Sequence, residues 1–296
     1  SYWLDIYKKY IRGFYCMVKV DFHVHTSASD GILSPRDIVK RAKMNGVKFL
    51  AITDHDTLTG LDEAISESLN QKIKVIPGIE LSTQHNNESV HVLGFFKGNS
   101  FKNSELIHEL NKIKNHRIIR AKKIIEKLKD EFNISINFDD IVKHSKDTVA
   151  RPHIARAIIN AGYDYSQDYI FDNFIGKGCK AYVPTLKLST EDGVHLLKKY
   201  NALVFLAHPK LINQSSIKDF LNMNFDGIEA VYCQNTTDET TYYLNIVDTN
   251  NMLSSCGSDF HGDIVNDTRH GDIGSMELSE KYLKPLLDAL DIPMTI

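Results

Sequence analysis

The sequence predicts an α/β fold: a distorted parallel barrel of strands and helices, interrupted by one helical insertion. Short apolar segments alternate with helical segments in the first third of the chain, an order typical of parallel strands joined by helices. Metal-ligand residue types also recur at the ends of the predicted strands, the edge where barrel enzymes place their reactive groups. Six of the 13 histidines lie in or directly after a predicted strand.

The first part of the barrel is expected at residues 17–98. Residues 18–25 alternate and are rich in β-branched side chains, which indicates a strand. A helix is predicted at 36–45, because Ser34-Pro35 is a helix start and Gly46 a helix stop. The other elements expected here are a helix at 59–70 and strands at 49–53, 74–79 and 89–96.

A long, lysine-rich helix predicted at 101–133 interrupts the alternation of strands and helices. Shorter helices are expected at 139–146, 151–161 and 167–175, so residues 99–178 are predicted to form a helical insertion over the barrel mouth. Residues 179–296 should complete the barrel. The elements expected there are helices at 191–200, 236–250 and 279–290 and strands at 202–208, 227–232 and 252–258.

Residues 1–16 are expected to be an N-terminal extension. They are aromatic and interrupted by charges, which is unlike a signal peptide. The segment either forms a short helix that docks on the barrel through Trp3, Ile6, Tyr7 and Tyr10, or is translated sequence upstream of the recognisable domain.

The stretch from Asp21 to Gly31 contains the first candidate metal ligands. His23 and His25 are two apart in a predicted strand, so they point to the same face and can share one ion. Asp30 follows small residues that allow the chain to fold back, and its carboxylate suits a neighbouring ion. Two solvated histidines at a strand end would be the more common interpretation of this motif alone.

The recurrence of such residues argues against that simpler interpretation. Later predicted strands end in or contain His55, Glu80, His91, His208, Asp259 and His261. Asp54 and Asp56 flank His55 and either orient imidazoles or serve as turn residues; the sequence leaves both open. Including His23, His25 and Asp30, this gives more candidate ligands than one ion can use.

Six motifs carry a family resemblance. In chain order they are DFHVHTSASDG, ITDHDT, PGIE, VHVLG, AHP and GSDFHG. The sequence resembles the polymerase-and-histidinol-phosphatase (PHP) superfamily of metal-dependent phosphoesterases from about residue 18 to the C-terminus, which implies a (β/α)7-type barrel. The phrases ARPHIA and GKGCKAYVP resemble the branch of nucleoside 3′,5′-bisphosphate phosphatases and short-oligonucleotide 5′-exonucleases.

The resemblance implies a cluster of two or three divalent ions. It implies one ion held by His23, His25, Glu80 and Asp259, a second sharing Glu80 with His91 and His208, and a third held by Asp30, His55 and His261. Mixed imidazole and carboxylate ligands fit Mn²⁺, Fe²⁺ or Zn²⁺, and the sequence does not choose among them. Glu80, Asp259 and His261 are also expected to be catalytic.

Such a cluster suits phosphate-ester hydrolysis, because bound metals lower the pKa of a water and neutralise charge on the phosphoryl group. No Cys-His pair, nucleophile elbow or phosphate loop indicates another chemistry. We therefore expect a phosphoesterase that hydrolyses phosphate monoesters of small nucleotides of the nucleoside 3′,5′-bisphosphate type. The alternatives are a 5′-to-3′ exonuclease on short RNA, a histidinol-phosphate-type phosphatase and, least favoured, a metal-binding module without turnover.

Three residues of the predicted insertion and its return segment are candidates for binding a substrate phosphate. Arg151 and His153 flank Pro152 at a predicted helix start, where free N–H groups and a guanidinium together favour an anion. Lys177 lies between two glycines, which permit close backbone approach to a phosphate. A surface arginine and a solvated hinge are the alternatives.

Composition limits the partners. With a net charge of −3 the chain lacks the broad basic surface that coats duplex nucleic acid, so a small phosphorylated nucleotide or a short oligonucleotide is the expected partner. No apolar run has the length of a membrane span. Four widely separated cysteines, without Cys-x-x-Cys, favour the reducing cytoplasm.

Overall fold

The computed structural model describes residues 15–145, 149–184, 188–262 and 269–295. Most of the expected N-terminal extension, residues 1–14, therefore lies outside the described residues, as does the docking helix considered for it. None of the described helices combines the length and the apolar character that crossing a bilayer requires.

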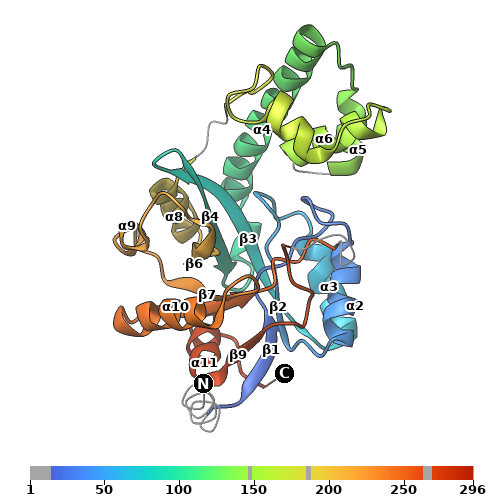
Figure 1. Ribbon diagram of the computed structural model, residues 1–296. Coiled ribbons are helices and arrows are strands. Elements are labelled where there is room, and N and C mark those ends of the chain that lie inside the picture. Colours follow the sequence, from blue (N-terminus) through green and yellow to red (C-terminus); the bar gives the residue numbers. More distant parts are fainter. Residues whose placement is uncertain (1–14, 146–148, 185–187, 263–268, 296) are drawn as a thin grey trace.

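Nine strands of the described residues form one sheet (Figure 1). They are β1 (Met17–Asp21), β2 (Phe49–Ile52), β3 (Lys74–His85), β4 (Glu88–Phe96), β5 (Leu188–Ser189), β6 (Ala202–Leu206), β7 (Gly227–Tyr232), β8 (Leu253–Gly257) and β9 (Glu277–Ser279). Their order is β8-β7-β6-β4-β3-β2-β1-β9, and β5 pairs with β3. The backbone N–H of Phe22 donates to Cys256 O at 2.9 Å, so β1 also meets β8 and the sheet nearly closes into a barrel. The predicted distorted α/β barrel is confirmed.

One strand runs against the expected direction. β4 pairs antiparallel with both β3 and β6, whereas the other neighbours among β1, β2, β3, β6, β7 and β8 are parallel. Asn86 and Asn87, with φ of 46° and 63°, make a two-residue turn between β3 and β4, and left-handed residues of this kind favour a tight hairpin. The expectation of parallel strands was wrong here. His91 therefore lies near the start of β4, at the edge where β3 carries its site residues.

Ten α-helices are described outside the short 3-10 and π turns, most within three residues of the predicted bounds. They are α2 (Pro35–Met44), α3 (Leu61–Gln71), α4 (Ser104–Phe132), α5 (Phe138–Ser145), α6 (Arg151–Asn160), α7 (Gln167–Ile170), α8 (Thr190–Lys199), α9 (Ile217–Leu221), α10 (Thr237–Thr249) and α11 (Glu280–Ala289). The helix expected at 167–175 divides into α7 and a π turn, Phe171–Ile175. The short elements β5, β9 and α9 were not predicted.

Both faces of the barrel strands are buried. Alternate residues of β1 and β2, such as Val20 and Phe49, pack inside the barrel in one cluster with Leu286 of α11. The intervening residues, such as Leu50, pack outward against α2 and α3. This explains why β2 consists of four fully buried residues in succession.

The insertion has a hydrophobic core of its own. Its buried residues run from Ala121 of α4 to Ala181, and partly buried Ile118 and Val183 extend the cluster. The first part of α4 instead packs on the barrel through Leu106 and Leu110. A single long helix thus belongs to both cores, and in Figure 1 it carries α5 and α6 away from the barrel body.

Candidate metal centre

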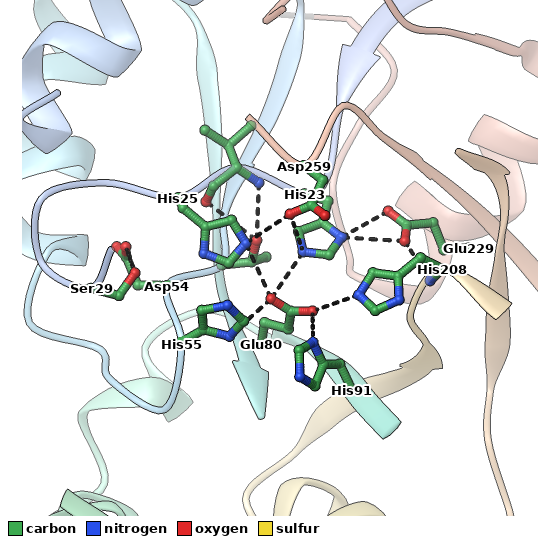
Figure 2. Close-up of polar contacts among 12 residues, drawn as sticks. His23, His25, Ser29, Asp54, His55, Glu80, His91, His208, Glu229 and Asp259 are labelled. Carbon is green, nitrogen blue, oxygen red and sulfur yellow. Dashed lines mark hydrogen bonds and ion pairs between the residues drawn. The ribbon is translucent and has the colours of Figure 1, made fainter. Parts of the chain in front are cut away.

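The carboxylate of Glu80, on β3, lies at the centre of a ring of imidazoles (Figure 2). Its Oε2 is 3.1 Å from Nε2 of His23, 3.1 Å from Nε2 of His25 and 3.0 Å from Nδ1 of His55. Its Oε1 is 2.7 Å from Nδ1 of His91 and 3.0 Å from Nε2 of His208. The two oxygens of one carboxylate thus face two different sets of histidines.

Asp259 lies on the other side of the same histidines. Its Oδ1 is 3.3 Å from Nε2 of His23, 3.1 Å from Nε2 of His25 and 3.7 Å from Nδ1 of His261. The hydroxyl of Tyr232 donates to its Oδ2 at 3.0 Å. Asp259 has a φ of 55°, a left-handed conformation of the kind that is often concentrated at functional sites.

Asp30 completes the arrangement. Its carboxylate oxygens are 3.6 Å from Nδ1 of His25, 3.6 Å from Nε2 of His55 and 3.3 Å from Nε2 of His261. All nine side chains expected as ligands are therefore joined in one network of contacts, although they come from separate strands and loops. Their role as metal ligands remains a prediction.

Within the described residues, four groups have ligand atoms close enough together to hold an ion. Two resemble the sets implied by the family resemblance: His23, His25, Glu80 and Asp259 form one, and His25, Asp30, His55 and His261 form another. A third group contains Glu80 with His55 and His91, and His208 also contacts Oε1 of Glu80. A fourth group adds His270 to Asp259 and His261.

His23 and His25 lie just beyond β1 rather than within it. The strand ends at Asp21, and only Val24 continues the pairing, through a parallel bridge to Phe260. The rings of His23 and His25 still lie close together, with centroids 5.1 Å apart. The expected shared site thus comes from a short, irregular extension of the strand.

Glu229 orients two of the histidines, although it was not predicted as a site residue. Its oxygens are 3.0 and 3.2 Å from Nδ1 of His23, and it accepts a hydrogen bond from the backbone N–H of His208 at 2.7 Å. Gly257 makes room for this contact, because an added Cβ there would collide with Glu229 and His23. A single acidic residue within the otherwise apolar strand β7 was the available signal in the sequence.

We expect Glu229→Gln to weaken metal affinity and activity by roughly ten- to a hundredfold, because His23 loses the carboxylate that fixes its ring. Glu88→Gln is the matched control, since this buried carboxylate accepts backbone N–H groups of Asn213, Gln214 and Ser215 instead. Metal affinity, measured by calorimetry on chelator-treated protein, should fall only for Glu229→Gln. Equal affinities for both variants would show that Glu229 serves the fold alone.

Asp54 and Asp56 organise the backbone around the cluster. Asp54 accepts hydrogen bonds from Thr26 N at 2.7 Å, Thr26 Oγ1 at 2.7 Å and Ser29 Oγ at 2.6 Å, which shapes the loop that carries Asp30. Asp56 accepts from the N–H of Ser82 at 2.7 Å and forms an ion pair with Arg117 of α4. These contacts give both residues the turn-shaping role that the sequence left open.

Opposite charges inside the cluster shift the pKa values of its members. Burial opposes ionisation of Glu80, but the surrounding imidazoles outweigh it and hold the pKa of this carboxyl well below its usual range. Burial also opposes protonation of His25, yet its close contacts with the carboxylates of Asp259 and Glu80 raise its pKa to about 10. Burial lowers the pKa of His55 to about 4, which leaves a ring lone pair available. Positive charge is thus favoured between the carboxylates.

The donor atoms themselves fit a bound cation. Within the described residues, Nε2 of His23, both ring nitrogens of His25 and Oε2 of Glu80 are buried without a hydrogen-bond partner, although they lie close together. Buried polar atoms are rarely left in this way unless a metal or another group satisfies them. Imidazole nitrogens mixed with carboxylate oxygens are the donors that Mn²⁺, Fe²⁺ and Zn²⁺ accept.

The candidate phosphate-binding residues lie in the insertion and the segment that follows it. Arg151 begins α6, with its guanidinium 5.6 Å from the centre of the Phe171 ring. His153 is buried, and its Nδ1 accepts the N–H of Ala150 at 3.1 Å, so it caps the same helix. Lys177 is exposed between its two glycines.

Arg120 of α4 was not predicted as a site residue. Its guanidinium donates to Val183 O at 2.7 Å. Burial, followed by the positive charges of Arg151 and Arg117, lowers its pKa to about 10. Positive charges that disfavour protonation of Arg120 favour a bound anion beside it. The i, i+3 spacing of Arg117 and Arg120 on a lysine-rich helix was the only sequence signal.

A protein-family model described as PHP domain matches residues 21–231. The chain belongs to the PHP family. The match covers most of the chain and includes seven of the nine positions joined around Glu80, Asp259 and Asp30; Asp259 and His261 lie beyond it, and Glu229 lies within it.

Two curated relatives extend the likeness over most of the chain. A 5′-3′ exoribonuclease of Haemophilus influenzae is 29% identical over 250 residues, which cover 82% of this chain and 90% of the relative. A 3′,5′-nucleoside bisphosphate phosphatase of Chromobacterium violaceum is 27% identical over 253 residues, covering 83% and 88% respectively.

Solved structures show the same likeness. A Bifidobacterium adolescentis protein proposed to be a metal-dependent phosphoesterase superposes with a TM-score of 0.77 at 27% identity, covering 91% of this PHP chain and 95% of that one. An amidohydrolase structure from Chromobacterium violaceum with bound sulfate gives a TM-score of 0.74 at 26% identity, with 86% and 92% covered. The predicted family, fold class and enzyme class, a hydrolase of phosphoric esters, are confirmed.

Proposed function

We propose that this PHP chain hydrolyses a phosphate monoester of a nucleoside 3′,5′-bisphosphate, with two or three divalent ions held by the nine side chains around Glu80, Asp259 and Asp30. The convergence of five imidazoles on the two oxygens of Glu80 carries the proposal, because it provides adjoining sites for more than one ion. Bound ions would activate a water and neutralise charge on the phosphoryl group.

The residues of the chain have separate tasks in this reaction. Glu229 and Tyr232 fix His23 and Asp259, so the ligand geometry is set before substrate arrives. Hydrolysis joins the water oxygen to phosphorus and breaks the ester P–O bond, and the departing alcohol takes up a proton. The guanidiniums of Arg151 and Arg120 are assigned to the second phosphate, which is not hydrolysed.

The metals and the compartment are part of the same proposal. Three of the four groups of ligand atoms include a carboxylate and at least two imidazoles around Glu80 or Asp30, which favours Mn²⁺, Fe²⁺ or Zn²⁺ over ions that prefer oxygen ligands only. The cysteines are free thiols, Cys16, Cys179, Cys233 and Cys256. Free thiols are consistent with action in the reducing cytoplasm.

We expect Arg151→Ala to lower kcat/KM for a nucleoside 3′,5′-bisphosphate by roughly ten- to a hundredfold, because charged hydrogen bonds to the second phosphate are lost. An aryl phosphate, which has no second phosphate, should be affected far less. Lys177→Ala should show the same selectivity more weakly, since a lysine lacks the planar fork. The matched control is Arg156→Ala, an exposed arginine on the same helix.

The measurement compares kcat/KM on the bisphosphate, the corresponding nucleoside monophosphate and the aryl ester. Equal losses on all three substrates for Arg151→Ala would place Arg151 at the hydrolysed phosphate or in the fold. The bisphosphate assignment would then lose its main support. Wild-type protein that releases no phosphate from the bisphosphate would contradict the assignment directly.

A further inference from the structure

A cavity of about 540 Å³ lies between the first part of α4, the strand β3 and the helix α8. It is lined by residues that none of the roles above uses, apart from Ser82 and Arg117. Its apolar surface comes from Ile113, Leu188 and Leu196. The volume falls within the range of roughly 300–1,000 Å³ that is usual for small-molecule sites.

The cavity adjoins the metal centre through two residues. Ser82 lies two positions after Glu80 on β3, so both side chains emerge on the same face of the strand, and Ser82 is paired in register with His91. Arg117 donates to Ser82 Oγ at 2.8 Å and forms an ion pair with Asp56, directly after His55. The inner wall of the cavity therefore lies beside the proposed ligands.

The lining also includes exposed cations and imidazoles, which we call the rim of the cavity. Lys112 and Lys199 each lie on the exposed side of a helix, and His116 and His195 lie near them on α4 and α8. Ammonium groups bind the phosphates of a nucleic-acid strand, and bases stack on flat aromatic rings. Apolar side chains combined with such a rim match one nucleotide.

Two carboxylates in the lining exclude a simple anion site. Glu109 is ion-paired with Lys112 at 2.8 Å, and Asp192 accepts a hydrogen bond from Ser189 at 2.7 Å. A cavity built only for phosphate would not place carboxylates beside its lysines. Carboxylates do accept hydrogen bonds from sugar hydroxyls and base amino groups, so they fit a whole nucleoside.

We propose that this cavity binds the nucleotide on the far side of the scissile phosphate when the substrate is a short oligonucleotide. The inference rests on the proposed function, because it takes the metal centre as the place of hydrolysis. In a bisphosphate the hydrolysed phosphate is terminal and nothing enters the cavity. In an oligonucleotide the same phosphate is a diester, and hydrolysis yields a phosphate monoester and an alcohol.

The test replaces both rim lysines, as Lys112→Ala combined with Lys199→Ala. The matched control combines Lys281→Ala with Lys284→Ala on α11, which is also the loss of two exposed, ion-paired lysines, one of them over a neighbouring tyrosine ring as Lys199 is. Binding of a labelled 5′-phosphorylated tetranucleotide with phosphorothioate links is measured by fluorescence anisotropy in Mn²⁺. kcat/KM is measured on the unmodified tetranucleotide and on the bisphosphate.

The rim variant should raise the Kd for the tetranucleotide about tenfold, the lower end of the effect of losing charged hydrogen bonds. The slope of log Kd against log salt should become shallower by about 0.7 for each lysine that contacts a phosphate. The ratio of kcat/KM for tetranucleotide over bisphosphate should fall about tenfold. The α11 control should match wild type in all three measurements.

Unchanged tetranucleotide affinity and salt slope in the rim variant would overturn the inference. Failure of the proposed function looks different, because wild type would then release no phosphate from the bisphosphate. The binding measurement still decides the role of the cavity in that case. Equal losses on tetranucleotide and bisphosphate would also overturn it, since the rim would then serve the centre as a whole.

Discussion

Replacing Asp259 by asparagine should lower phosphate release by roughly a thousandfold or more, because a displaced ligand misplaces the attacking water as well as weakening metal binding. Asp259 contacts His23, His25 and His261 and is held by Tyr232. Asparagine has the same size and tolerates the left-handed φ of 55° at this position. The loss can therefore be assigned to the missing charge rather than to the backbone.

Asp248→Asn is the control, since it neutralises an exposed carboxylate that is ion-paired with Lys281 at 2.8 Å. Bound metal, thermal unfolding and kcat/KM are measured on wild type and both variants, and His25→Ala is added as a second loss of a ligand. Both site variants should lose metal and activity while remaining folded. Near-normal rates in either site variant under limiting metal would show that the cluster does not carry turnover.

Removal of metal should abolish activity, and Mn²⁺ should restore it at least about tenfold better than Mg²⁺. The reason is the donor set, in which six imidazoles accompany the carboxylates of Asp30, Glu80 and Asp259. Mg²⁺ prefers oxygen ligands and gives up its waters reluctantly. Rates are measured on one chelator-treated preparation with each ion added back.

Zn²⁺ and Fe²⁺ under anaerobic conditions complete the series, because the same donors accept them. A further control adds each ion to the Asp259→Asn variant, which separates rescue at the cluster from metal bound elsewhere. Rescue by Mg²⁺ equal to or better than that by Mn²⁺ would contradict the proposed ligand set.

Most positions of the candidate ligands could be predicted from the sequence because they lie within or shortly after an apolar strand. Both faces of β2 are buried, so its sequence is a continuous apolar run. The polar residues that follow it lie at the edge of the barrel. The same logic placed Glu80 and His208. It failed for the direction of β4, since the hairpin depends on two asparagines in left-handed conformations, a weaker signal than an Asn-Gly pair.

Residues that act through others were harder to predict. Glu229 resembles an ordinary strand residue until β7 and β8 place it against His23, and Arg120 becomes part of a site only when α4 brings it beside Arg151. Both depend on contacts between segments far apart in the chain. Spacing along one element cannot reveal such contacts, whereas it did reveal that His23 and His25 lie together.

Titration of chelator-treated protein with Mn²⁺ tests the central claim most directly, with bound metal and phosphate release from a nucleoside 3′,5′-bisphosphate measured on the same samples. We predict no release without metal, and a rise that saturates as the second or third equivalent binds around Glu80, Asp259 and Asp30. Release that persists at zero bound metal, or that stays absent when the ligands are saturated, would contradict the account.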